Sequence, residues 1–120
     1  SSIIKTKTNK SNPNLPKFIA ENFTYDEEND LYKYEINEDG ENVSFEYNAK
    51  LKNFGIIKVD YRMLYENETK YLSIYEVKDG QSVKIIVVDT KDNSCIFGNC
   101  EKHQKLITDF TSNYRHMLDI

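Results

Sequence analysis

Two cysteines near the C-terminal end of the chain are the residues whose type and spacing most directly indicate chemistry. Cys95 and Cys100 are separated by Ile96-Phe97-Gly98-Asn99, and the Gly-Asn pair in this segment is typical of a turn. A short loop of this kind can bring two sulfur atoms within bonding distance, so we predict a Cys95–Cys100 disulfide. Because disulfides persist in oxidising compartments, the pair predicts a periplasmic or secreted protein. Two reduced cysteines in a cytosolic protein are the alternative.

Other cysteine chemistries fit this spacing less well. A redox role needs a thiolate, and a helix beginning after Cys100 would lower its pKa, but four intervening residues are not the C-x-x-C arrangement. A zinc site would have only His103 as a nearby third ligand, whereas structural zinc sites use four. We therefore predict neither redox catalysis nor a metal site.

The remaining candidates for catalysis do not form a set. His103 and His116 are thirteen residues apart, which on one helix corresponds to about 220° of rotation and hence to different faces. Residues 35–46 place Asp39 and Glu46 at offsets like those of a calcium loop, but the strand-like flanks favour a hairpin turn. The sequence thus predicts a protein that is not an enzyme and has no cofactor. A cleft joining His103 to acidic residues would reverse the prediction about catalysis.

The predicted disulfide closes a small loop that carries Ile96 and Phe97. If this loop is an exposed finger, the two residues are candidate anchors for another protein, because desolvated aromatic side chains contribute strongly to interfaces. Alternatively, Phe97 folds back and fills a gap between the sheet and the following helix. We favour this second arrangement, because a lone aromatic residue at such a junction is usually packed.

Tyrosine is the other unusual feature, with nine copies, of which eight lie in residues 25–75. Tyr71 and Tyr75 alternate with Leu72 and Ile74, which indicates a strand with apolar character on both faces. One face then packs in the core, and the face with Tyr71 and Tyr75 is a candidate partner surface, since tyrosine is enriched at interfaces. Ordinary core packing of these tyrosines is the stronger of the two interpretations.

Strands must position these residues. From Asn22 to Thr90 apolar and polar residues alternate, and a turn signal interrupts the pattern about every eight to twelve residues, which predicts an antiparallel β-meander. The Asp-Gly pairs at 39–40 and 79–80 predict tight hairpins. We expect five or six strands, including one long strand over 54–65.

Helices are expected at both ends of the sheet. Asn14 as N-cap and Pro16 in the first turn predict a short helix over 15–21. Apolar residues recur at steps of three and four over 101–118, which is typical of an amphipathic helix. The predicted fold class is therefore α+β: an antiparallel five- to six-stranded meander, as an open sheet or a partial barrel, with a short N-terminal helix and a C-terminal amphipathic helix.

The first part of the chain differs in composition from the rest. Residues 1–14 are polar and lysine-containing, with only two apolar positions, and predict a flexible tether ahead of a single domain over 15–120. In a bacterial lipoprotein such a tail connects a lipidated cysteine to the folded domain. A lipid anchor upstream of Ser1 is thus one interpretation, and an ordinary chain terminus is the other.

Size and charge narrow the function. The chain has 120 residues, is 38% apolar and 30% charged, and carries a net charge of −4. Dispersed lysines in an acidic chain argue against a nucleic-acid partner, and the longest apolar run, 85–88, is far short of the about 20 residues of a membrane span. We expect a small, non-enzymatic, extracytoplasmic protein-binding module of the inhibitor, immunity-protein or lipoprotein-chaperone type, whose acidic charge favours a basic partner. The alternative is a carrier that holds a lipid or another amphipathic ligand in a partly open β-barrel closed by the C-terminal helix.

Overall fold

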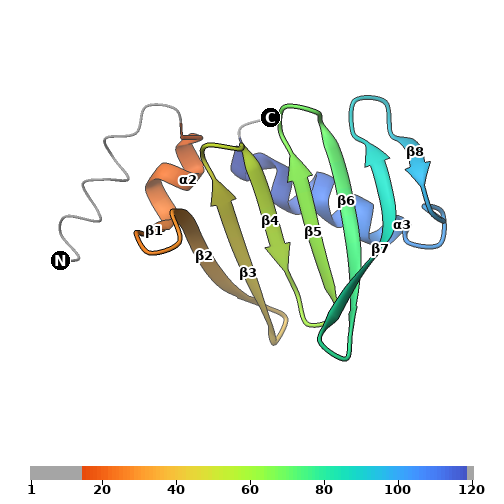
Figure 1. The fold of residues 1–120 in the computed structure, drawn as a ribbon, viewed down its shortest axis with the longest axis horizontal. Helices are drawn as coiled ribbons and strands as arrows, with labels where there is room; N and C mark the ends of the chain where they lie inside the picture. Colours follow the sequence, from red (N-terminus) through yellow and green to blue (C-terminus); the bar gives the residue numbers. More distant parts are fainter. Residues whose placement is uncertain (1–14, 119–120) are drawn as a thin grey trace.

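The computed structural model describes residues 15–118, which form one antiparallel sheet of eight strands, preceded and followed in the sequence by helical segments (Figure 1). Each strand pairs with the next one in the sequence, so the sheet is a meander. The edge strands do not pair with each other, and the sheet is open rather than a partial barrel. The predicted meander is confirmed, but the strands outnumber the five or six expected. They are β1 (Thr24–Asp26), β2 (Leu31–Glu38), β3 (Glu41–Asn48), β4 (Asn53–Ile57), β5 (Tyr61–Glu66), β6 (Tyr71–Lys78), β7 (Gln81–Asp89) and β8 (Ser94–Phe97).

Two kinds of turn alternate along the meander. At one end of the sheet, the Asp39-Gly40 and Asp79-Gly80 pairs both have positive φ, as the predicted tight hairpins require. At the other end, the connections 27–30, 49–52, 67–70 and 90–93 each finish on a residue in the left-handed conformation. Aspartate or asparagine side chains at three of the preceding strand ends accept backbone N–H bonds from these loops: Asp26, Asn48 and Asp89.

The long strand predicted over 54–65 is wrong. The chain turns at Lys58–Asp60, and β4 and β5 form a hairpin. The Lys58 N–H donates to the Tyr61 carbonyl over 2.9 Å, and Val59 in the turn is 68% exposed. This turn is closed by a backbone hydrogen bond and contains no glycine, proline or asparagine, so Asp60 is the one turn-favouring residue that the sequence offers there.

Both predicted helices are present, but their α-helical parts are shorter than expected. The N-terminal helix, α2 (Lys17–Asn22), is short and begins directly after Pro16. Asn14, the predicted N-cap, and the predicted tether over 1–14 lie outside the described residues. At the C-terminal end, α3 (Gln104–Asp109) continues into a π-helical turn over Phe110–Tyr114 and a 3₁₀ turn over Arg115–Leu118. We call Gln104–Leu118 the C-terminal helical segment.

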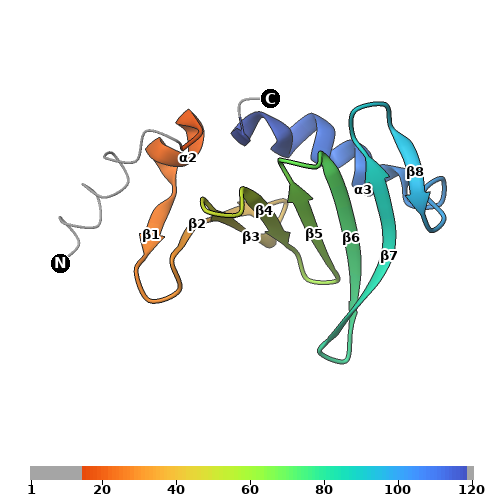
Figure 2. The same cartoon turned by 45° about the horizontal axis from the view of Figure 1, so that its top comes forward.

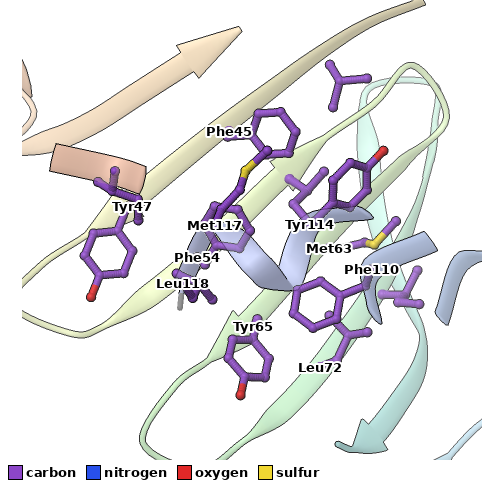
Figure 3. Close-up of a cluster of buried hydrophobic side chains, with 14 of the residues drawn as sticks. Phe45, Tyr47, Phe54, Met63, Tyr65, Leu72, Phe110, Tyr114, Met117 and Leu118 are labelled. Atoms are coloured by element: carbon purple, nitrogen blue, oxygen red, sulfur yellow. The ribbon is translucent and has the colours of Figure 1, made fainter. Parts of the chain in front are cut away.

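The C-terminal helical segment lies diagonally across one face of the sheet and forms the core with it (Figures 1 and 2). Its apolar side chains interleave with inward-facing side chains of the strands, and the two ring pairs Phe45–Tyr114 and Tyr65–Phe110 have centroids 5.3 and 5.0 Å apart. Burying each such side chain stabilises the fold by about 1.5–3 kcal/mol. The cluster includes Phe45, Tyr47, Phe54, Met63, Tyr65, Leu72, Phe110, Tyr114, Met117 and Leu118 (Figure 3).

Strand geometry determines which residues lie on the side of the sheet opposite the C-terminal helical segment. Successive side chains of a strand point to opposite sides of the sheet, so the residues between the core positions point away from the C-terminal helical segment. No helix among residues 15–118 covers this second side, because α2 packs beside the end of the C-terminal helical segment on the same side of the sheet (Figure 2). We call this second side the uncovered face.

A polar contact at the edge of the core ties the C-terminal helical segment to the sheet. The Tyr114 hydroxyl donates to Glu38 Oε1 over 2.9 Å, across a sequence separation of 76 residues. Burial, reinforced by the hydrogen bond to the Glu38 carboxylate, raises the pKa of Tyr114 above its ordinary value of 10.0. The folded protein therefore holds this phenol proton more tightly than the unfolded chain does.

This difference predicts a specific loss of stability at alkaline pH. Tyr114 contributes fully below pH 10.0, its ordinary pKa, and its contribution declines as the pH rises above that value. Tyr114→Phe should lower the free energy of unfolding by about 1 kcal/mol at neutral pH, and its stability should then fall less steeply than wild type above about pH 10. Urea unfolding across this pH range measures both quantities. Identical alkaline profiles for the two proteins would contradict the assignment.

Candidate functional site

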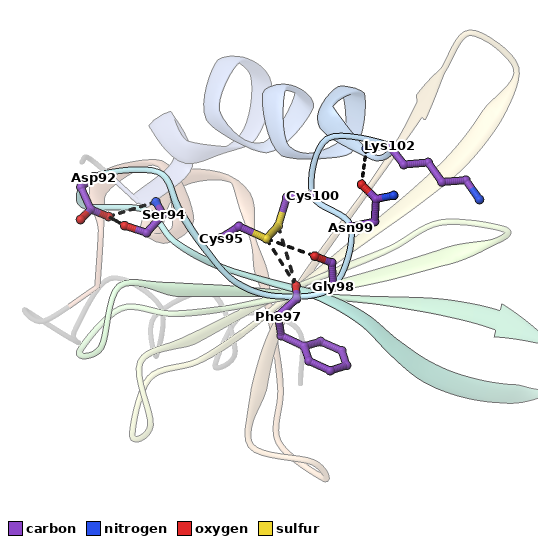
Figure 4. The surroundings of a disulfide bond; sticks show 8 residues. All are labelled: Asp92, Ser94, Cys95, Phe97, Gly98, Asn99, Cys100 and Lys102. Carbon is purple, nitrogen blue, oxygen red and sulfur yellow. Dashed lines mark hydrogen bonds between the residues drawn. A yellow bond between two sulfur atoms is a disulfide. The ribbon is translucent and has the colours of Figure 1, made fainter.

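The predicted disulfide is present. Cys95 on β8 and Cys100 in the following loop are bonded, with their Cα atoms 6.1 Å apart (Figure 4). The bond ties the short edge strand to the segment that leads into α3. It therefore fixes the position of β8, which pairs with one strand only.

The segment carrying Ile96 and Phe97 is an edge strand rather than a protruding finger. Val87 pairs with Phe97 and Val88 pairs with Cys95, so Ile96 is the extra residue of a bulge in β8. The Phe97 ring lies on the opposite side of the sheet from the C-terminal helical segment (Figure 4).

The favoured prediction, that Phe97 fills the core, is wrong. Phe97 is 53% exposed and Ile96 is 55% exposed. The reason is pairing: Val87 points to the uncovered face, because its neighbours Ile86 and Val88 are buried in the core, and cross-strand partners share a face. The helix therefore has no access to the Phe97 ring.

Gly98 allows the end of β8 to lie against β7. It has a φ of +84°, and a Cβ atom built on it would overlap the carbonyl oxygen of Ile85. Ile85 lies in a β-bulge, since Ile86 pairs with Ile74 but Lys84 pairs with Tyr75. The bulge and the glycine together let the chain pass close to β7 and continue toward Cys100.

Tyr71 and Tyr75 also lie on the uncovered face. Leu72 and Ile74, which alternate with them on β6, are fully buried in the core. Tyr71 is 38% exposed, and Tyr75 is half-buried on the face away from the helix. The structure thus brings Phe97, Tyr71 and Tyr75 to one side of the sheet, and core packing, the stronger sequence interpretation, is wrong for these two tyrosines.

A shallow hollow of about 290 Å³ lies on the uncovered face beside Gly55. Gly55 has no side chain to fill the surface between its cross-strand neighbours Glu46 and Leu64. Tyr75 and Arg62 also line the hollow. It is large enough for one apolar side chain, with a guanidinium group at its rim.

A second, polar groove of about 330 Å³ lies where the Lys58–Asp60 turn meets the start of α3. The Lys58 side chain is only 12% exposed; its Nζ lies 3.8 Å from Asp109 Oδ2 and 5.5 Å from the centre of the Tyr114 ring. The residues lining this groove are Glu41, Lys58, Asp60, Tyr61, Lys102, His103, Lys105, Leu106 and Asp109.

The polar groove joins His103 to acidic residues, which was the condition set for reconsidering catalysis. Two of these carboxylates are engaged, however: Asp109 pairs with Lys58, and Glu41 Oε1 accepts the N–H of Val59 over 3.4 Å, while Asp60 is the third acid at the groove. Within residues 15–118 no carboxylate is hydrogen-bonded to the His103 imidazole. The base-and-orienting-acid geometry of general-base catalysis is therefore not formed.

The described residues hold no group of three or more histidine, cysteine or acidic side chains arranged to bind a metal ion. The calcium-like segment is a hairpin, in which Asn37 Oδ1 accepts the Gly40 N–H over 3.0 Å. Between residues 15 and 118 the helices are all too short or too polar to cross a membrane.

Comparisons with protein-family models, with curated proteins and with solved structures find no match to this chain.

The disulfide can be tested by mass and by stability. Purified without reductant, the protein should be lighter than its reduced form by two hydrogens. The paired substitution Cys95→Ser with Cys100→Ser should lower the free energy of unfolding by about 2 kcal/mol, because the bond closes a short loop in the unfolded chain. Two free thiols in a titration of the native, non-reduced protein would contradict the bond.

Gly98→Ala should cost more stability than a glycine substitution at a hairpin with the same backbone conformation. Gly80 also has a positive φ, of +77°, but nothing lies within 4 Å of an added Cβ. Gly80→Ala should therefore cost about 1 kcal/mol of backbone strain, whereas Gly98→Ala must also move the chain away from Ile85. We expect a clearly lower melting temperature for Gly98→Ala and faster amide exchange in β8. Equal effects of the two substitutions would show that β8 does not pack as described.

Proposed function

We propose that this protein is a small, non-enzymatic protein-binding module that uses its uncovered face, at the β6–β8 end, to bind another protein. The observation that carries the proposal is the exposure of Phe97 and Tyr71 on the same face, at 53% and 38%. A large aromatic ring left in water on a disulfide-held edge strand gives up stabilisation that burial in the core would provide. Exposed aromatic residues of this kind are the side chains that most often dominate binding energy.

The proposal includes an extracytoplasmic location, periplasmic or secreted. It is supported by the Cys95–Cys100 disulfide, since such bonds persist in oxidising compartments. The net charge of −4 would steer a basic partner toward the protein during association. An inhibitor, an immunity protein or a lipoprotein chaperone would each use such a surface.

The alternative, a lipid carrier, receives less support from the geometry. The described strands form an open sheet, and the side of the sheet that a barrel would enclose is filled by fully buried side chains such as Phe45, Phe54 and Phe110. A carrier would need to open this core to admit a ligand, which would expose the apolar surface that stabilises the fold.

The Phe97 side chain provides the direct test. Phe97→Asp should change the free energy of unfolding by no more than about 1 kcal/mol, because the ring is half exposed and outside the core. Affinity for a partner isolated from the extracytoplasmic fraction of the source cells should fall by about thirtyfold or more, the effect of losing a desolvated aromatic anchor. Leu51→Asp is the matched control, since Leu51 is 62% exposed in the β3–β4 loop.

Melting curves and calorimetric titration with the isolated partner measure the two effects. Undiminished binding by Phe97→Asp would contradict the proposed function. A loss of several kcal/mol in stability would show instead that Phe97 belongs to the folded core.

A further inference from the structure

We infer that the uncovered face binds an amphipathic α-helix of the partner protein, laid across β5 to β8 between a row of acidic side chains and a row of basic ones. This inference rests on the proposed function and specifies the partner's chemistry. Its basis is the strand register, which arranges the side chains of this face in three parallel rows.

The middle row is apolar. Leu64 pairs with Ser73, Ser73 with Val87, and Val87 with Phe97, so one residue from each of four adjacent strands lies in line across the sheet. Gly55 extends the row by one strand, at the hollow already described. Ser73 is only 6% exposed, so the room for a side chain of an apposed element lies at the Gly55 end of the row, and Phe97 stands exposed at the other end.

The flanking rows carry opposite charges. On one side of the apolar row, the register aligns Glu66, Tyr71 and Asp89. On the other side it aligns Arg62, Tyr75 and Lys84, with Lys84 Nζ 5.6 Å from the centre of the Tyr75 ring. An occupant of the apolar row would therefore have acids along one flank and bases along the other, with a tyrosine in each flank.

The occupant is a helix because of backbone hydrogen bonding. Strands β5, β6 and β7 are each paired on both sides, so the face offers no free N–H or C=O groups to an incoming segment. A segment lying there must satisfy its own backbone internally, as an α-helix does. The C-terminal helical segment already packs on the opposite face of the same sheet in this way (Figure 1).

The dimensions of the rows fit a helix. Positions two apart along a strand are separated by about 6.7 Å, so the acidic and basic rows are about 13 Å apart. An α-helix with its side chains is about 10–12 Å across. The four strands span about 14 Å between the first and last, which corresponds to about ten helical residues, or three turns.

The charge pattern also sets the helix direction. A helix placed with its apolar stripe on the middle row can lie in either of two opposite directions. Reversing the direction exchanges the flank that faces the acidic row with the flank that faces the basic row. A helix with lysines on one flank and glutamates on the other satisfies both rows in only one direction. Such a partner is recognised by its orientation as well as by its apolar residues.

The test uses a synthetic helical peptide of about fifteen residues, long enough for the about ten residues of the site. It carries leucines at helical spacing, lysines along one flank and glutamates along the other. We expect it to bind the full chain and to shift the amide NMR signals of β5 to β8. A peptide that differs only in a central proline, and so cannot form a continuous helix, should bind at least about tenfold more weakly.

Reversing the basic row provides the decisive comparison. The double variant Arg62→Glu with Lys84→Glu should bind the peptide with lysines on one flank and glutamates on the other about tenfold more weakly, a loss of about 1.4 kcal/mol. It should bind a peptide with lysines on both flanks more tightly than that mixed-flank peptide. Lys78→Glu is the matched control, because the Lys78 side chain is 75% exposed at the β6–β7 hairpin, outside the three rows. The control should bind the mixed-flank peptide as wild type does.

Several results would overturn the inference. They are equal binding of the helical and proline peptides, shifts confined to the polar groove around Lys58, or a charge-reversed variant with unchanged preference. A dimer of the protein alone that Phe97→Asp abolishes would assign the face to a second copy of this chain instead. Each of these leaves the proposed function standing if a natural partner still requires Phe97, whereas a partner that binds Phe97→Asp normally would overturn the proposed function itself.

Discussion

The packing of the C-terminal helical segment against a single face of the sheet is the contact on which the rest of this structure depends. Phe110 and Tyr114 lie on Tyr65 and Phe45, and the apolar side chains of the strands meet them from β3 to β7. A meander of short hairpins has no core of its own, because each strand presents apolar residues to a plane that only another layer can cover. The segment supplies that layer once. The segment crosses one side of the sheet only. Within the part of the chain that the structure describes, the second side is exposed to solvent.

Local turn chemistry and periodicity made much of this fold predictable. The Asp39-Gly40 and Asp79-Gly80 pairs marked two hairpins, alternation marked the strands, and a period of three to four residues marked the helix that begins at Gln104. Prediction failed at one turn with a weak sequence signal and at one edge strand whose geometry is set by non-local pairing. The Lys58–Asp60 turn is closed by a backbone bond between ordinary residues. Phe97 was expected in the core because a lone aromatic residue between a sheet and a helix is usually packed. Its side of the sheet is set instead by the register of β7 and β8, which includes bulges that composition does not reveal.

The two surface features differ in what they offer a ligand. In the polar groove, the half-buried charges of Lys58 and Asp109 face each other, and Lys58 also lies over the Tyr114 ring. This ion pair connects the β4–β5 turn of the sheet to α3. The uncovered face has the opposite character, since its apolar row is flanked by charges whose cross-strand neighbours are tyrosines rather than counter-ions. Alternation with Leu72 and Ile74 placed Tyr71 and Tyr75 on one face. Only the register shows that Phe97 shares this face and that charges of opposite sign border it.

The central claim is that the uncovered face is the working surface, and side-chain footprinting tests it most directly. Hydroxyl-radical labelling of the free protein should modify Phe97 and Tyr71, which are exposed, and should leave the buried Tyr65 and Tyr114 unmodified. In the presence of the partner, the account predicts protection of Phe97 and Tyr71 together, with unchanged labelling of exposed Leu51. Protection confined to His103 and Tyr61 in the polar groove, with Phe97 still labelled at its free rate, would contradict the account.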